Sequence, residues 1–268
     1  MVYFLQIYCS HYGPKARPVA YGLLGEDYII EREAEDPAED WIAPLNRALE
    51  SLPIQNTLYL FHGQFETRIL WPYLTKKARE RLERAAADLF DEIKKRTALA
   101  PLASYSLANL ALEGGYKGSV CVGENFPRFF KEADTETLRA QIEENLKAMA
   151  AAETYLAHLK SRLRRGELEI DGFSLQPFQI TGTTESSMDR YVQYDDLLYV
   201  EKAGRFTLDA PAKTLPYDAE RRALVLECDM PIEQSVPAPE GYLIFALDHV
   251  VYYGTLLSLI YNLRNKSV

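Results

Sequence analysis

The stretch VYFLQIYC (residues 2–9) begins the part of the chain that decides the fold. It is rich in aromatic and β-branched residues and alternates along its length, which is typical of a β-strand. Two further apolar segments follow, PVAYGLL (18–24) and YIIERE (28–33), and the GED between them favours a tight hairpin turn. The three segments together predict an antiparallel meander.

The next segments predict a fourth strand that the chain reaches through a helix. DPAEDWIAPLNRALESL (36–52) has apolar residues at helical spacing, and TLYLF (57–61) is a short apolar strand. A second helix is predicted to begin near Phe65. Because a strand that follows a crossover helix commonly returns to the same sheet, we expect a mixed sheet flanked by helices, which is an α/β fold.

The remaining chain falls into a helical part and a β-rich part. One helix is predicted over 75–96 with Thr75 as its N-cap, a short one over 105–115, and a long one over about 135–165. Beyond Gly166, short apolar runs alternate with Pro, Gly and Asp, and an apolar helix ends the chain. We therefore expect two units, residues 1–165 and a β-rich extension over 166–268.

Composition and charge exclude several classes of protein. The net charge of −9 argues against broad electrostatic attraction to nucleic acid, and the basic clusters at 76–84, 94–95 and 160–165 are predicted to be solvated helix faces. No run approaches the roughly 18 apolar residues of a membrane span, so we expect a cytoplasmic protein with no membrane partner. Three distant cysteines (Cys9, Cys121 and Cys228) predict free thiols, without a disulfide framework or a structural zinc site.

Four segments, in this order and spacing, resemble motifs of one enzyme family. They are YFLQIYC (3–9), FHGQFETRIL (61–70), YSLANLALEGGY (105–116) and ENLKAMAAAETYL (144–156). Together they resemble the DEDD-type (DnaQ-like) 3′–5′ exonucleases. The resemblance covers about residues 2–163, and it implies a ribonuclease H-like mixed sheet with flanking helices.

The resemblance also implies where a metal site would lie. Such nucleases hold two divalent cations about 4 Å apart, with four carboxylates as ligands. The matching positions here are Gln6, Tyr8, Glu66 and Ala148, and Glu144 stands where the family has a tyrosine one turn before the last ligand. Glu144 lies on the same helix face as Ala148 and is a candidate to replace part of the lost ligand set. With so few carboxylates we expect no cofactor; any residual activity would require Mg²⁺ or Mn²⁺.

Three functions therefore remain open. The first is a catalytically degenerate exonuclease-like protein that binds single-stranded nucleic acid or serves in a nucleoprotein complex. The second is an active metal-dependent 3′–5′ exonuclease that uses Glu66 and Glu144 with non-standard ligands. His62 lies four residues before Glu66, which allows an acid–base pair, although its place at a strand end favours a structural hydrogen-bonding role. The third is a protein-interaction module that docks a partner through apolar residues of the last helix, Leu256, Leu257, Leu259, Ile260 and Leu263.

Overall fold

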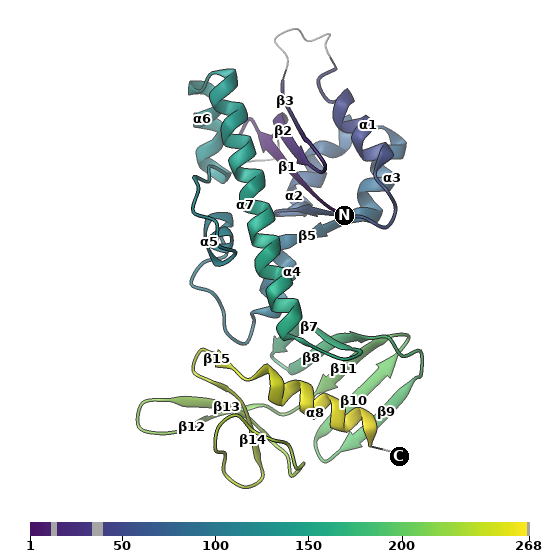
Figure 1. The fold of residues 1–268 in the computed structure, drawn as a ribbon, viewed down its shortest axis with the longest axis vertical. Coiled ribbons are helices and arrows are strands. Elements are labelled where there is room, and N and C mark those ends of the chain that lie inside the picture. Colours follow the sequence, from purple (N-terminus) through teal and green to yellow (C-terminus); the bar gives the residue numbers. More distant parts are fainter. Residues whose placement is uncertain (12–14, 34–39, 267–268) are drawn as a thin grey trace. The chain divides into compact units, whose positions relative to one another are not determined.

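The computed structural model describes residues 1–11, 15–33 and 40–266, apart from the side chain of Glu124 (Figure 1). Contacts divide the chain into two compact units. The first unit contains Met1–Asp91 and Ser104–Leu156, and the second contains Glu92–Ala103 and Ala157–Val268. The expected division at residue 165 differs from this one, because 92–103 and the end of the long helix belong to the second unit. Residues 36–39 of the first predicted helix lie outside the described residues.

The first unit is built on a mixed sheet of five strands. Its order is β3-β2-β1-β4-β5, in which β4 and β5 run parallel to β1 and the other pairs are antiparallel. The predicted meander and the crossover that returns β4 to the edge of β1 are both confirmed. The strands are β1 (Val2–Cys9), β2 (Pro18–Leu24), β3 (Tyr28–Arg32), β4 (Thr57–Leu60) and β5 (Ala86–Asp88).

Helices cover both faces of this sheet (Figure 1). On one face, α1 (Ala43–Ser51), α2 (Gly63–Leu70) and α3 (Lys76–Ala85) share an apolar core with the strands. On the other face, α7 (Thr135–Arg162) lies so close that a Cβ on Gly22 would come within 2.5 Å of Ile142. The remaining helical elements of the unit are α5 (Leu107–Glu113), α6 (Phe126–Glu132) and the short 3₁₀ turns η1 (Trp71–Tyr73) and η2 (Gly123–Asn125).

The single helix predicted over 75–96 is wrong, because β5 interrupts it. α3 ends at Ala85, residues 86–88 pair with the free edge of β4, and α4 (Leu89–Arg96) follows. Asp88 stabilises this break from both sides: its Oδ1 accepts the N–H of Phe90 at 3.0 Å, and its Oδ2 accepts the N–H of Gly63 at 2.7 Å. The N-cap prediction is confirmed, since the Thr75 hydroxyl accepts the N–H of Ala78 at 3.2 Å.

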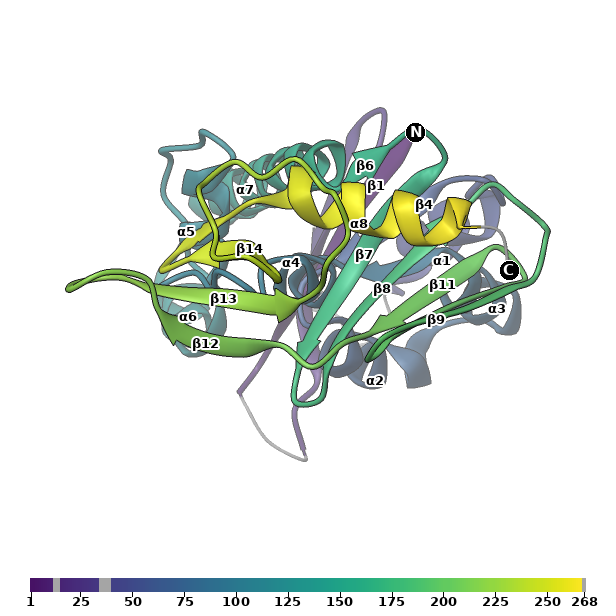
Figure 2. The ribbon, with the colours of Figure 1, turned by 90° about the horizontal axis from the view of Figure 1, so that it is seen from below.

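After residue 163, the second unit consists of two antiparallel sheets and a helix, as the β-rich pattern predicts. The sheet orders are β6-β7-β8-β11-β10-β9 and β12-β13-β14-β15. Figure 2 shows α8 (Tyr253–Asn265) crossing the strands, and it contacts both sheets. The strands are β6 (Arg164–Arg165), β7 (Leu168–Leu175), β8 (Phe178–Thr184), β9 (Arg190–Tyr194), β10 (Leu197–Lys202), β11 (Arg205–Asp209), β12 (Lys213–Pro216), β13 (Arg222–Glu227), β14 (Tyr242–Leu247) and β15 (Val250–Val251).

The apolar face of α8 is part of the core of this unit. Its residues pack with buried side chains of both sheets, so they are covered by the chain itself. The prediction that this face docks a protein partner is therefore wrong for the residues on which it rested: Leu256, Leu257, Leu259, Ile260 and Leu263 are all buried.

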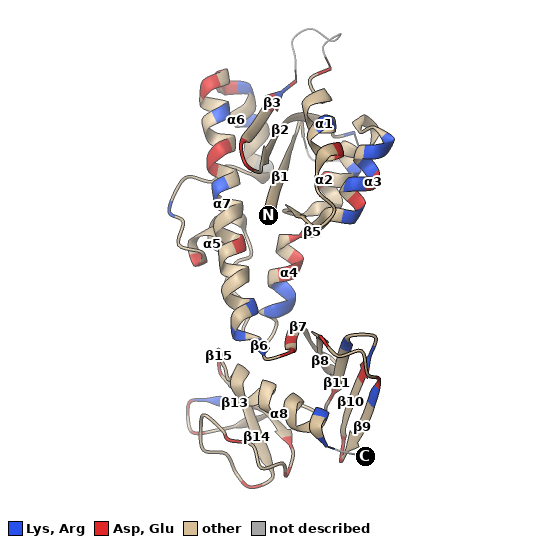
Figure 3. Ribbon diagram, turned by 45° about the vertical axis from the view of Figure 1, so that its right-hand side comes forward, with Lys and Arg blue, Asp and Glu red and all other residues tan. Residues whose placement is uncertain are grey.

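Figure 3 marks the basic residues along the chain; those at 76–84 and 94–95 lie on helices, as predicted, whereas Arg164 and Arg165 of the third cluster form the strand β6. Lys76 and Lys77 on α3 and Lys94 and Lys95 on α4 are exposed. The three cysteines are free, which is also as predicted. No helix in the described part of the chain has the length and apolar character needed to cross a bilayer.

Candidate functional site

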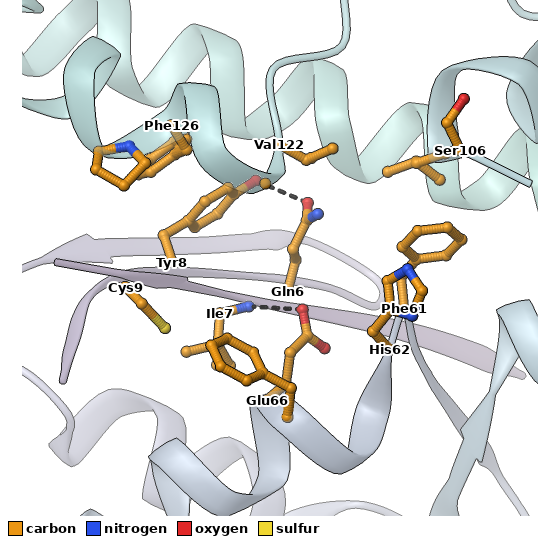
Figure 4. Close-up of a pocket in the computed structure, with 14 residues that line it drawn as sticks. Gln6, Ile7, Tyr8, Cys9, Phe61, His62, Glu66, Ser106, Val122 and Phe126 are labelled. Atoms are coloured by element: carbon orange, nitrogen blue, oxygen red, sulfur yellow. Dashed lines mark hydrogen bonds between the residues drawn. The ribbon is translucent and has the colours of Figure 1, made fainter. Parts of the chain in front are cut away.

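A pocket of about 410 Å³ lies beside the end of β1 in the first unit (Figure 4). It brings together Gln6, Tyr8 and Glu66, three of the positions at which the sequence resemblance places metal ligands, with His62 beside them. The rest of the lining is mainly apolar: Ile7, Cys9, Phe61, Phe65, Ser106, Leu107, Val122, Gly123, Phe126 and Pro127.

Glu66 supports the sheet where β1 and β4 separate. The two strands pair only as far as Phe4 and Tyr59, so further along β1 the backbone is no longer paired with β4. Glu66 projects from the first turn of α2 and its Oε1 accepts the N–H of Ile7 at 3.3 Å. The residue is only 5% exposed, which makes this buried hydrogen bond a substitute for a missing strand contact.

Burial raises the pKa of the Glu66 carboxyl well above its ordinary value of 4.5. The negative charge of Asp88 adds to this rise, while the backbone N–H groups of Ile7 and Phe61 oppose it. The second carboxyl oxygen, Oε2, has no hydrogen-bond partner among the described residues. The protonated form is therefore favoured over a wider pH range than in a solvated glutamate.

Gln6 and Tyr8 belong to a buried hydrogen-bond chain that ends on Asn145 of α7. Asn145 is fully buried; its Oδ1 accepts the N–H of Cys121 at 2.9 Å, and its Nδ2 donates to the Cys121 carbonyl at 2.7 Å and to Tyr8 Oη at 2.8 Å. The Tyr8 hydroxyl in turn donates to Gln6 Oε1 at 2.7 Å. The Tyr8 ring stacks on Phe126, with centroids 3.9 Å apart.

Sequence reasoning missed Asn145 and took Glu144 instead. A signal was present, because Asn145 falls three residues after Ile142 on the apolar stripe of the long helix, where a polar residue must find buried partners. Glu144 faces elsewhere: its carboxylate accepts from Tyr116 and from Lys147 at 2.7 Å, contacts that lower its pKa. Glu144 does not line the pocket, and Ala148 is buried within the protein.

His62 stands at the rim of the pocket. It is the left-handed residue before α2 (φ 61°) and its side chain is exposed. Its ring makes no capping hydrogen bond to α2. The ring instead packs beside Phe61 and Phe90, at centroid distances of 4.7 and 4.5 Å.

The donor groups of the pocket do not fit a pair of divalent cations. Hard cations need several anionic oxygens, whereas Gln6 offers an amide, Tyr8 a phenol and Glu66 a carboxyl group already bonded to Ile7. Across the described residues, no three His, Cys, Asp or Glu side chains gather in a way that would hold a metal ion.

Comparisons with known proteins give no family assignment. No protein-family profile matches the chain, and no curated protein matches it. Among solved structures, the chain is similar to phi29 DNA polymerase in its ternary complex with primer-template DNA and incoming nucleotide substrates. That similarity has a TM-score of 0.34 and 15% sequence identity, and it covers 61% of this chain and 32% of the polymerase chain. The chain thus matches about a third of the polymerase's length.

Proposed function

We propose that the first unit is a degenerate, ribonuclease H-like module of the DEDD exonuclease type that binds single-stranded nucleic acid without cleaving it. The observation that carries the proposal is the convergence of Gln6, Tyr8 and Glu66 in one pocket. Residues from β1 and from the start of α2 meet where the resemblance implies a metal site. The strand order β3-β2-β1-β4-β5, antiparallel and then parallel, supports the same fold.

The chemistry of the pocket supports binding and disfavours hydrolysis. A single buried carboxyl group leaves the charge of two cations uncompensated, and hydrogen bonds already engage Gln6 and Tyr8. Aromatic rings of Phe61 and Phe65 line the same space, and such rings stack on unpaired bases at about 1–3 kcal/mol per base. The module would act alone or within a nucleoprotein complex.

Fluorescence anisotropy with labelled single-stranded DNA and RNA tests binding, at low and fixed salt concentration with a duplex as comparison. We expect saturable binding of a single strand that Phe65→Ala weakens about tenfold, because the variant removes one stacking surface. Leu112→Ala removes an exposed apolar side chain from α5 outside the pocket, and should leave binding unchanged. Absence of binding to both single strands would refute the proposal.

A nuclease assay tests the second half of the proposal. With Mn²⁺ or Mg²⁺ present, we expect the wild-type protein to cleave single strands no faster than its Glu66→Ala variant. Cleavage by the wild type that disappears in Glu66→Ala would establish the active exonuclease instead.

A further inference from the structure

The pocket contains a buried polar atom that the described protein leaves unsatisfied. Glu66 is 5% exposed, its Oε1 accepts the N–H of Ile7, and its Oε2 has no hydrogen-bond partner among the residues that the structure describes. Figure 4 shows this second oxygen turned away from the Ile7 nitrogen. A buried polar group without a hydrogen bond costs about 1–3 kcal/mol, so a molecule that supplies a partner gains that free energy on binding.

The hydrogen-bond chain fixes which end of the Gln6 amide faces the pocket. Because Asn145 Oδ1 accepts the N–H of Cys121, its Nδ2 must face Tyr8 Oη, and the hydroxyl hydrogen is then directed to Gln6 Oε1. Gln6 Nε2 points away from Tyr8, as Figure 4 shows. Gln6 therefore presents its amide N–H donors to the pocket, and a ligand must supply the acceptor for them.

The walls select against charged ligands. No Lys or Arg is among the described residues that line the pocket, so a phosphate would lose its hydration there without a compensating charge. The outward N–H groups of Gln6 disfavour a cation. Aromatic rings of Phe61, Phe65 and Phe126 supply flat apolar surface, and about 410 Å³ lies within the usual range for small-molecule sites.

We infer that this pocket binds an uncharged planar ring with an amide edge. The carbonyl oxygen of the ring accepts from Gln6 Nε2, and the adjacent ring N–H donates to Glu66 Oε2, which accepts it in the ionised form of the carboxyl group. Uracil, thymine and guanine carry such an edge, whereas adenine has no carbonyl group. Naming nucleobases as the source of the ring rests on the proposed function; the base could come from a free nucleoside or from a single strand.

Isothermal titration calorimetry of the full chain with nucleosides tests the inference. We expect uridine to bind with 1:1 stoichiometry and at least about tenfold more tightly than adenosine, since a lost hydrogen bond costs roughly 1.4 kcal/mol. The analogue 3-methyluridine keeps both carbonyl groups but lacks the ring N–H, and it should lose about tenfold. This comparison uses only the wild-type protein and needs no variant to fold.

A variant that exchanges the hydrogen-bond donors of Gln6 for an acceptor tests the inference by mutation. Gln6→Glu keeps the acceptor for Tyr8 but replaces the N–H donors with an oxygen, so uridine binding should fall at least about tenfold. Gln64→Glu makes the same change at an exposed position of α2 outside the pocket, and should not alter binding. Circular dichroism and thermal melting confirm that each variant is folded.

Two results would overturn the inference. In the first, the protein binds uridine no more tightly than adenosine or 3-methyluridine. In the second, it binds no nucleoside, so that the pocket holds only water. Oligouridine and oligoadenosine separate this failure from that of the proposed function. Single strands that bind equally well while free uridine does not would leave the proposed function standing. Free uridine that binds while no single strand binds would refute only the proposed function.

Discussion

Replacing Glu66 by Gln should make the folded protein more stable at neutral pH and remove one source of its pH dependence. The amide keeps an oxygen to accept the N–H of Ile7, so that hydrogen bond is preserved. The amide nitrogen takes the place of Oε2. Because Oε2 has no hydrogen-bond partner among the described residues of the wild type, this exchange breaks no hydrogen bond. The main difference is that Gln cannot ionise.

The sign follows from the raised pKa of the buried carboxyl. Between its ordinary value of 4.5 and its higher folded-state value, the folded protein holds a proton that the unfolded chain has released. Rising pH therefore favours the unfolded chain, by about 1.4 kcal/mol for each pH unit inside this window. Below the window the carboxyl is protonated in both states, so the stabilities of the wild type and the Glu66→Gln variant should differ least there.

Urea denaturation of the wild type and Glu66→Gln at about pH 4.5, 5.5 and 6.5 measures this effect. The difference in unfolding free energy should grow in favour of the variant by about 1 kcal/mol in the first step, where the unfolded carboxyl is still half protonated, and by about 1.3 kcal/mol in the second while the pH stays inside the window. Glu80→Gln, at an exposed position on α3, should show no such growth. A difference between wild type and Glu66→Gln that stays constant with pH would refute the reasoning.

Four further outcomes are expected, three from residues outside the pocket and one from Cys9 in its lining. Gly114→Ala should destabilise the protein by about 3 kcal/mol in urea denaturation, because its Cβ would lie 1.9 Å from a backbone carbonyl oxygen of α7. Gly254→Ala in α8 meets no atom within 4 Å and should stabilise by about 0.5–1 kcal/mol; equal effects of the two changes would contradict the packing. Arg264→Met removes the guanidinium 3.1 Å from the fully buried Glu201 carboxylate and should cost about 3–5 kcal/mol, part of which Glu201→Gln in the same chain should restore. Burial raises the pKa of the Cys9 thiol to about 12, so a chromogenic thiol reagent at about pH 8 should label it only after urea unfolds the protein, and rapid labelling of the native thiol would show that the site is open.

The fold could be predicted where local chemistry agrees with tertiary structure. The alternating strand over 2–9 and the GED turn specify the meander without reference to the rest of the chain. β5 shows where this fails: Ala86 and Ala87 favour a helix, and only the free edge of β4 draws them into the sheet. That edge is a non-local feature, and no window of sequence around residue 86 contains it.

The pocket residues from β1 and α2 could be predicted individually, whereas on the long helix only the element could. The order of the motifs placed Gln6, Tyr8 and Glu66 together, and the structure brings them into one pocket. On the long helix, consecutive side chains point about 100° apart around the helix axis, so Glu144 and Asn145 face different directions. The apolar stripe would have selected Asn145, whereas the spacing of the family motif pointed to Glu144.

Glu66 shows why one carboxyl group in the pocket is weak support for catalysis. Its Oε1 satisfies the Ile7 N–H where β1 has lost β4 as a partner, and this contact requires no metal. An apolar residue at position 66 would bury that N–H without a hydrogen bond, at about 1–3 kcal/mol, in a sheet that supports the whole first unit. The backbone therefore gives a sufficient reason for a hydrogen-bond acceptor at this position. Only the unpaired Oε2 lacks a structural reason, and it is the atom that a ligand would reach.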